Sequence, residues 1–366
     1  MATTIEKAAR AAKAAAGVTI VKLTVRAQRV PMAEPHRTAS GTVTESPLVL
    51  VDLATSEGVT GRSMVFSYTA AALQPLADFV ANLEPLVVGK PLDPASLTRS
   101  LLARFRLLGT HGLVGMAISA IDMAAWDAAA RLKGVPLCRL LGATPRPTPA
   151  YGGVGYDGER DSARAAEAWA RRGLKGVKSK IGYPTIEEDI AVLRAMRSAI
   201  GPAVALMCDY NQSLGVTEAI ERAHRLDDAG LDLRWIEEPV QAENYAGLAA
   251  VARAARTPIN AGENWWGPLE FAKAMDAGAS DLLMPDAMKT FGVTGWLEIA
   301  ALANVRGLPV TSHLFPEVSA HLLAATPTAR WLEYTDWWNP VLEHPLEIRD
   351  GLAIPSESPG SGISWN

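Results

Sequence analysis

Seven polar side chains recur at regular intervals along this 366-residue chain, and all are of types that bind hard cations or move protons: five carboxylates, one amine and one imidazole. Each lies at the end of a short apolar run, and the intervals between them are 29, 28, 26, 23, 27 and 20 residues. Such an interval holds one strand, one helix and two short loops, so the pattern predicts repeated βα units. In chain order the seven are Lys180, Asp209, Glu237, Glu263, Asp286, His313 and Glu333.

A closed barrel of parallel strands would bring these seven side chains together. Parallel strands are covered on both faces and read as apolar runs, as do ALMC before Asp209 and DLLM before Asp286. A charge at the carboxyl end of such a strand is not explained by the core, but barrel enzymes keep their chemistry at that end. The alternative is a set of solvated strand ends with no shared role, which the regular spacing disfavours. We therefore predict a (β/α)7–8 barrel of the TIM type.

Three of the carboxylates are predicted to share a metal ion. Asp209, Glu237 and Glu263 end three successive strands, and ligation by oxygen alone suits Mg²⁺, with Mn²⁺ as a substitute. Three unpaired acids facing one another would raise each other's pKa, which a cation relieves. The alternative is that they form ion pairs with Lys or Arg at the barrel mouth.

Two lysines are predicted to enter the same mouth. Lys178 and Lys180 flank one residue of a strand, so both side chains project to one face. Two ammonium groups beside a divalent ion oppose each other's protonation, so one of them can be neutral and act as a base. Lys180, nearer the strand end, is the candidate. The alternative is a pair of solvated surface lysines.

Asp286 and His313 end neighbouring strands, where a carboxylate can orient an imidazole and raise its basicity. A lone histidine is more often a core residue, and the preceding strand's aspartate favours the catalytic reading. Lys180 and His313 would then face each other across the mouth. Two such bases, with a Lewis acid on an adjacent carboxylate, suit removal and return of an α-proton. The metal, Lys178 and a protonated Glu333 would stabilise the enolate dianion.

Composition limits the possible partners and locations. The chain is 49% hydrophobic and carries a net charge of −4, which indicates a large core and gives no general attraction to nucleic acid or anionic membranes. Cys138 and Cys208 fall in segments that read as buried, so we expect reduced core thiols. No run of 18 apolar residues is present, so we expect no membrane span and a cytoplasmic protein.

The order of elements predicts two domains between two terminal segments. Residues 1–17 read as a frayed helical tail, 18–143 as an α+β capping domain, 144–345 as the barrel, and 346–366 as a segment that packs back on the cap. Within the cap, 18–30 and 42–54 read as antiparallel strands followed by three helical segments. The stretch 31–41 (PMAEPHRTASG), polar and bounded by Pro and Gly, reads as a surface loop.

The chain resembles the mandelate racemase group of the enolase superfamily over residues 18–365. The resemblance is carried by the segments KSKIGYP, DYNQSL, WIEEP, GENW, MPDAMK, GVTGW and SHLF. It implies the fold described above, with a mobile cap loop near residues 31–47 that closes over the substrate. It also implies homo-oligomers, octamers or dimers, and a small-molecule carboxylate as substrate.

The resemblance implies a role for each residue of the mouth. Lys180 would act on the (S)-configured α-carbon, and His313 with Asp286 would act on the opposite face. Lys178 would neutralise the substrate carboxylate, Glu333 would donate a hydrogen bond to it, and Asn211 would contact the α-hydroxyl. The Mg²⁺ ligands would be Asp209, Glu237 and Glu263.

Departures from the group concern the substrate pocket. Gly153 replaces a serine that lies near the substrate carboxylate in the racemase, which removes a hydroxyl donor. His36 and Ser40 replace valines of the cap loop, whereas Val43 is retained, so the lid is more polar. Tyr68 completes the set of candidate pocket residues.

The prediction is therefore a Mg²⁺-dependent racemase or epimerase of a 2-hydroxy acid. A dehydratase of a sugar acid or hydroxy acid would use the same residues, and the polar lid and Gly153 favour it. A non-catalytic, metal-binding barrel is the alternative from another class, and it predicts the loss of a catalytic group that this chain retains.

Overall fold

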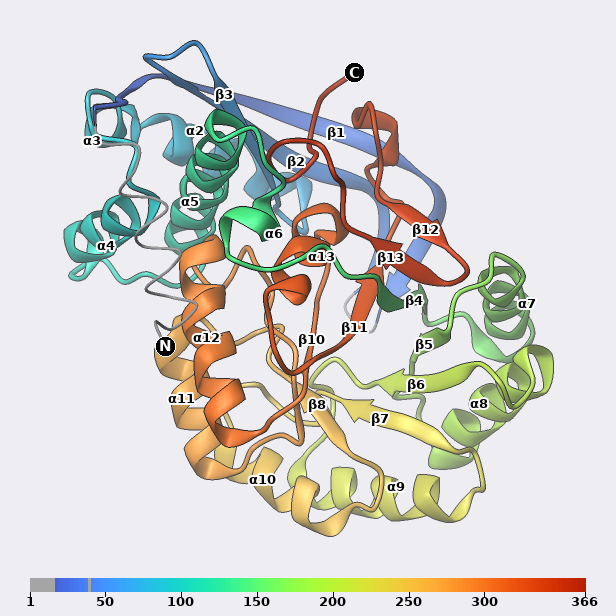
Figure 1. Ribbon diagram of the computed structural model, residues 1–366. Helices are drawn as coiled ribbons and strands as arrows, with labels where there is room; N and C mark the ends of the chain where they lie inside the picture. The colour runs from blue at the N-terminus through green and yellow to red at the C-terminus, as the bar shows by residue number, and fades with distance from the viewer. Residues whose placement is uncertain (1–16, 39–40) are drawn as a thin grey trace.

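The computed structural model describes residues 17–38 and 41–366. A closed barrel of eight parallel strands forms one half, and a three-stranded antiparallel sheet with flanking helices caps it (Figure 1). Neighbouring barrel strands pair in chain order, and β11 pairs with β4 to close the ring. The predicted barrel and cap are confirmed. The barrel strands are β4 (Thr148–Val154), β5 (Gly176–Lys180), β6 (Ala205–Asp209), β7 (Leu233–Glu237), β8 (Ile259–Ala261), β9 (Leu282–Leu283), β10 (Val310–Thr311) and β11 (Ala329–Tyr334).

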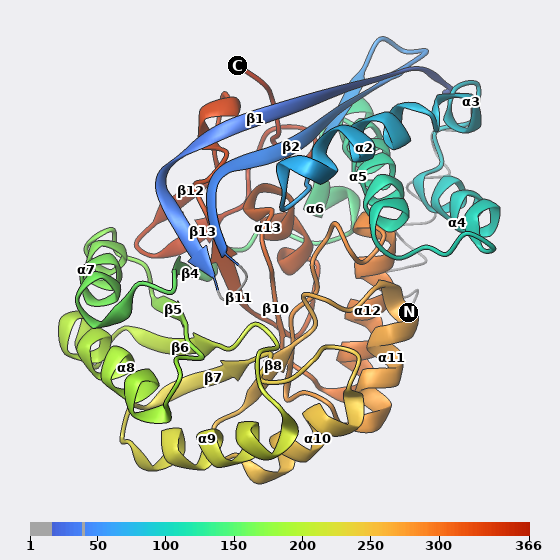
Figure 2. The same cartoon turned by 180° about the vertical axis from the view of Figure 1, so that it is seen from behind.

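Helices connect successive barrel strands and form the outer ring (Figures 1 and 2). The helix α8 (Ile186–Ile200) is an example of how the sequence forms this ring. A capping box between Thr185 and Glu188 fixes its start, and its apolar face is buried on the sheet. After β11 the described chain turns through the 3₁₀ helix η1 (Asn339–Val341) instead. The ring helices are α7 (Gly158–Arg171), α8 (Ile186–Ile200), α9 (Val216–Asp228), α10 (Tyr245–Ala254), α11 (Gly267–Ala277), α12 (Gly292–Arg306) and α13 (Pro316–Ala324).

The barrel interior is filled by large side chains below the mouth. Tyr151 on β4, Met207 on β6, Trp235 on β7 and Met284 after β9 form one buried cluster. Because side chains alternate along a strand, the next inward positions on β6 and β7 lie one layer higher. Those positions are Asp209 and Glu237. The packed cluster is thus the floor on which the charged layer rests.

The cap consists of the sheet β1 (Ile20–Thr38), β2 (Gly41–Thr55) and β3 (Thr60–Phe66), followed by helices. Its central helix, α5, has the length and apolar composition of a membrane span, but 89% of that window is buried inside the protein. Packing against β3 and α12 accounts for this composition. The other helices are α2 (Ala70–Ala81), α3 (Glu84–Val87), α4 (Pro94–Phe105), α5 (Leu113–Leu132) and α6 (Leu137–Leu140).

The prediction of a surface loop over residues 31–41 was wrong. β1 continues to Thr38 and pairs with β2, with His36 opposite Val43, after a register shift between Pro31 and His36. Most side chains of this extension are exposed, so no apolar alternation marks it, and only the backbone pairing makes it a strand. The hairpin end reaches down to the barrel (Figure 2), where the Tyr156 amide donates to the Arg37 carbonyl oxygen at 2.9 Å.

The C-terminal segment touches both parts of the molecule. β12 (Glu347–Arg349) pairs with β13 (Leu352–Ile354), which pairs antiparallel with β4 of the barrel. Further on, the Trp365 indole donates to Asp52 of the cap at 3.0 Å. The proposed domain limits stay a prediction, and of the predicted tail only residue 17 is described. Cys138 and Cys208 are buried and free, as expected.

Close packing of β3 on α5 depends on Gly61. A methyl group there would lie 2.1 Å from the Ala124 carbonyl oxygen and 2.5 Å from the Ala128 nitrogen. We expect Gly61→Ala to lower the free energy of unfolding by about 1–3 kcal/mol through overpacking, measured by urea denaturation. Gly215→Ala, where a methyl group meets nothing within 4 Å, is the control. Equal stability of the two variants would contradict this packing argument.

Candidate active site

Three buried carboxylates meet at the barrel mouth. Asp209 and Glu237 are the last residues of β6 and β7, and Glu263 lies two residues beyond β8. One oxygen of each lies within 4.8 Å of the others, and the residues are 0%, 0% and 6% exposed. The spacing in the sequence is thus converted into one compact group of oxygen ligands.

Hydrogen bonds fix the direction of the first two carboxylates. Asp209 accepts from the Lys180 ammonium and from the Asn211 backbone amide at 2.7 Å. Glu237 accepts from the Lys178 ammonium through one oxygen and from the Trp235 indole at 2.9 Å through the other. The Trp235 side chain in the floor of the barrel therefore fixes the orientation of the Glu237 carboxylate above it.

Lys178 and Lys180 both point into the mouth, as predicted for residues two apart on a strand. In the strand register, Lys180 lies opposite Asp209 of β6, and Lys178 lies opposite Gly153 of β4. Burial lowers the pKa of each ammonium, but attraction to Glu237 for Lys178, and to Asp209 for Lys180, raises it above its ordinary value. The neutral Lys180 is expected beside a bound divalent ion, and it stays a prediction.

His313 and Asp286 form the predicted pair. Their strands run side by side, and His313 Nδ1 lies 2.7 Å from Asp286 Oδ2. The other ring nitrogen, Nε2, lies 3.2 Å from Glu263 Oε2. Burial lowers the pKa of the imidazole, yet the charges of Glu263, Glu333 and Asp286 raise it overall. Asp286 therefore holds the imidazole ring of His313, and the Nε2 atom of the ring points towards Glu263.

Glu333, near the end of β11, is held by a lysine and a backbone amide. Its Oε1 lies 2.9 Å from Lys178 Nζ, and its Oε2 accepts from the Leu314 amide at 3.0 Å. Burial raises the pKa, but Lys178 and His313 outweigh it and lower the pKa to about 2. The proton on Glu333 is expected with substrate and cation bound, and it stays a prediction.

Acids outnumber bases in the mouth, which suits a cation. Burial, with the charges of Asp209 and Glu263, raises the pKa of Glu237 well above its usual range in spite of Lys178. One Glu263 oxygen also lacks a hydrogen-bond donor among the described residues. The oxygen set fits Mg²⁺. Within the described residues, six carboxyl groups face three ammonium groups and one imidazole: Asp209, Glu237, Glu238, Glu263, Asp286 and Glu333 against Lys178, Lys180, Lys289 and His313.

A cavity of about 500 Å³ lies above the charged layer and under the cap hairpin. Lys178, Lys180, Asn211, Glu263, His313 and Glu333 line its base. All four described pocket candidates, His36, Val43, Tyr68 and Gly153, line its walls. Ser40 lies outside the described residues. The structure therefore brings the predicted bases and pocket residues to one enclosed space.

Aromatic rings form part of the cavity walls. The His36 ring lies 4.9 Å from that of Trp337, and burial together with Lys180 lowers the pKa of His36 to about 3. Phe66 and Trp169 line the cavity as well. A side chain at Gly153 would meet nothing within 4 Å. The missing hydroxyl at that position thus leaves open space.

Backbone strain is concentrated around the mouth. Asn211, Gln212 and Glu238 have φ angles of 43°, 66° and 36°, and Leu314 has 48°. Non-glycine residues adopt such angles at a cost, and only where surrounding contacts impose them. At Asn211 the strained backbone has a clear result: both the backbone amide and the side-chain amide donate to Asp209.

Sequence reasoning missed three residues beside the chosen ones. Glu238 follows Glu237 in WIEEP, Asn264 follows Glu263 in GENW, and Lys289 ends MPDAMK. Glu238 is 1% and Lys289 5% exposed. Their presence in the same motifs was the available signal, but only one charge per strand end was assigned.

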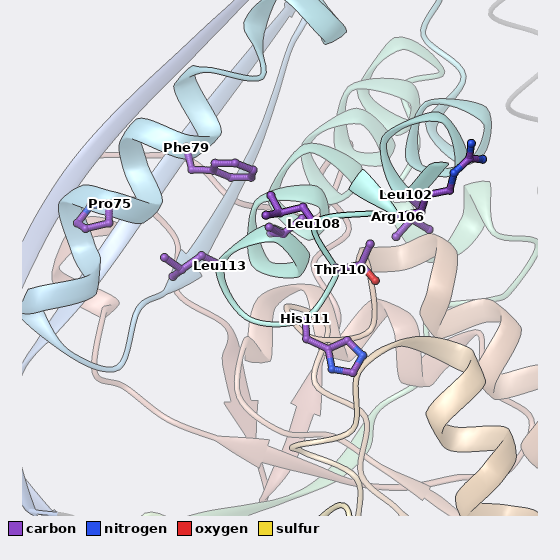
Figure 3. Close-up of a pocket in the computed structure, with 10 residues that line it drawn as sticks. Pro75, Phe79, Leu102, Arg106, Leu108, Thr110, His111 and Leu113 are labelled. Atoms are coloured by element: carbon purple, nitrogen blue, oxygen red, sulfur yellow. The ribbon is translucent and has the colours of Figure 1, made fainter. Parts of the chain in front are cut away.

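Another cavity, of about 870 Å³, lies in the cap away from the mouth. It is bounded by Pro75 and Phe79 of α2 and by Leu108, Thr110 and His111 after α4 (Figure 3). None of its described lining residues carries a carboxylate. Its lining is mostly apolar, and the predicted site residues lie at the barrel mouth instead.

Fold and site together define a metal-binding barrel enzyme of the enolase type. Residues 20–142 match the mandelate racemase/muconate lactonizing enzyme N-terminal domain, and residues 161–366 match the enolase C-terminal domain-like family. The chain therefore belongs to the mandelate racemase/muconate lactonizing enzyme family of the enolase superfamily.

Relatives in this family carry out different reactions. An enolase from Bradyrhizobium, solved with magnesium and mandelic acid, is 46% identical with a TM-score of 0.91, covering 95% of this chain and 96% of that one. L-talarate/galactarate dehydratase of Salmonella typhimurium is 32% identical over 88% of this chain and 81% of its own length. A 3,6-anhydro-alpha-L-galactonate cycloisomerase of Streptomyces coelicolor is 30% identical over 88% and 90%. The predicted oligomer and cytoplasmic location stay predictions.

The carboxylate group predicts a stabilising effect of Mg²⁺. A ligand that binds only the folded state adds about 2.7 kcal/mol at a hundredfold excess over its Kd. We expect MgCl₂ to raise the melting temperature of the EDTA-treated protein, and Glu237→Gln to abolish that rise. Asp276→Asn, at an exposed side chain of α11, should keep it. An equal rise in Glu237→Gln would exclude Glu237 as a ligand.

Proposed function

We propose that this protein is a Mg²⁺-dependent enzyme that removes and returns the α-proton of a 2-hydroxy carboxylate, a racemase or epimerase. One observation carries the proposal: Lys180 and His313 line one cavity and contact opposite members of the carboxylate triad. Lys180 bonds Asp209, and His313 Nε2 faces Glu263 at 3.2 Å. Two bases on either side of a cation site suit proton transfer at both faces of one carbon.

Mg²⁺ would be held by Asp209, Glu237 and Glu263. The ion supplies Lewis-acid stabilisation of the negative charge that develops on the substrate carboxylate. With their charge shared by a cation, the three acids attract the neighbouring ammonium groups less. The pKa of Lys180 then falls towards the range a general base requires.

His313 would serve as the base for the other face. Asp286 accepts from Nδ1, which leaves Nε2 as the atom that exchanges the proton with the substrate. The imidazole is fixed on both sides by strand pairing of its residue and by this hydrogen bond. Its position therefore needs little reorganisation during proton transfer.

Lys178 and Glu333 would bind the substrate carboxylate. Lys178 Nζ lies between Glu237 and Glu333 and supplies positive charge at the base of the cavity. A second carboxylate arriving beside Glu333 raises the pKa of Glu333, because like charges oppose ionisation. Substrate binding would thus convert Glu333 into the hydrogen-bond donor that the reaction needs.

The cavity walls favour a monocarboxylate with an aromatic or apolar tail. The basic side chains among its described lining residues are Lys178, Lys180 and His313 at the base and the neutral His36. A second carboxylate at the far end would therefore be buried without a cation, at considerable cost. Rings such as those of Phe66 and Trp337 instead suit a flat apolar group.

Dehydration of a hydroxy acid is the second candidate. Thr42, Thr69 and Thr335 line the cavity and give hydroxyl partners for a polyol. His313 would then act as an acid on a β-hydroxyl after the same first proton transfer. The sequence relationship to a dehydratase supports this candidate.

Exchange of the α-proton in D₂O separates the two bases. We expect Lys180→Ala to lose exchange from one enantiomer of a 2-hydroxy acid and His313→Asn to lose it from the other, as followed by NMR. Lys175→Ala, an exposed lysine at the opposite end of β5, should retain both. Equal loss from both enantiomers in each variant would argue against two bases.

A matched substrate pair tests the pocket. With Mg²⁺, we expect kcat/KM for mandelate to exceed that for the diacid galactarate by at least about tenfold, which corresponds to about 1.4 kcal/mol of discrimination. When the reactions run in D₂O, accumulation of deuterated substrate indicates racemisation, and accumulation of a 2-keto acid indicates dehydration. Preferred turnover of the diacid would refute the assignment of a monocarboxylate.

A further inference from the structure

A hydrogen-bonded group of three side chains lies against the carboxylate triad and has no part in the chemistry proposed above. Asn264 Nδ2 donates to Glu263 Oε1 at 3.1 Å and to Glu238 Oε2 at 2.8 Å. Its Oδ1 accepts from Lys289 Nζ at 2.6 Å. Both ends of the amide are thus engaged, so the Asn264 side chain has one orientation.

Lys289 is a buried cation that reaches the acids indirectly. It is 5% exposed, and within the described residues no carboxylate oxygen lies within 4.0 Å of its Nζ. Its ammonium instead bonds Asn264 and lies 4.9 Å from the centre of the Tyr68 ring. Burying an ammonium group without strong partners costs free energy. A lysine with only a structural role would therefore be more stable at the surface, so the burial of Lys289 indicates a role in the site.

Glu238 anchors the other side of the amide. It is 1% exposed, and its Oε1 lacks a donor among the described residues. Its backbone φ of 36° is one of the strained angles of the mouth. Strain and an unpaired buried oxygen are both unfavourable for folding alone, and they point to a role in the site.

We propose that Asn264 and Lys289 are positioning residues that fix Glu263 for cation binding. The amide sets the direction of one Glu263 oxygen, and Lys289 and Glu238 keep the amide from turning. This inference rests on the Mg²⁺ site of the proposed function. Partners of this kind, one bond removed from a metal, typically change metal affinity by about 10–100-fold when removed.

Titration calorimetry with MgCl₂ on the EDTA-treated full chain tests the proposal. We expect Asn264→Leu and Lys289→Met each to raise the Kd for Mg²⁺ by about 10–100-fold. The double variant should be no weaker than the weaker single variant, because both act through one amide. Lys289→Arg, which keeps charge and donor, should recover most of the affinity. Lys273→Met, an exposed lysine on α11, is the control.

The outcomes separate this proposal from the one it rests on. A wild-type Kd in Lys289→Met and Asn264→Leu overturns the positioning role, even if the metal-free variants melt at a lower temperature, because that result describes a structural role only. If Asn264→Leu does not fold, Lys289→Met decides alone. A wild-type chain that binds no Mg²⁺ contradicts the proposed function instead.

Discussion

Mutual repulsion of buried carboxylates is the constraint around which the mouth is built. Two unit charges about 4.8 Å apart repel by about 3.5 kcal/mol at an effective dielectric constant of about 20. Asp209, Glu237 and Glu263 meet this cost together, and Lys178 and Lys180 offset only part of it. Such a cluster persists because the surrounding fold contributes far more than it costs, and because a cation relieves it.

The barrel imposes that geometry through strand periodicity. Tyr151, Met207 and Trp235 form the floor, and the residues two positions further on are Gly153, Asp209 and Glu237. The floor also acts chemically, because the Trp235 indole donates to Glu237. Packing and catalysis are therefore adjacent layers of the same strands, and a change in the floor would be felt in the site.

The predictable parts of the structure are those that burial controls. The interval between charged residues predicted the closed barrel, and helix α8 matched its apolar period because one face must cover the sheet. The hairpin extension to Thr38 escaped prediction, since backbone pairing holds it and most of its side chains are exposed. The pKa of Glu333 is a further property that the sequence does not give, because it depends on Lys178 and His313, which only the folded chain brings near.

In the proposed function, proton transfer and the choice of substrate belong to different parts of the molecule. Lys180 and His313 belong to the barrel, whose charged layer would serve racemisation and dehydration equally. His36 and Val43, by contrast, come from the cap hairpin and line the walls of the cavity. A fold that separates these two tasks can change substrate by altering residues of the hairpin while the costly carboxylate cluster stays intact. Such a separation would explain why relatives of one architecture are named for different reactions, and it would place the determinants of specificity in the hairpin, whose strand pairing the sequence did not reveal.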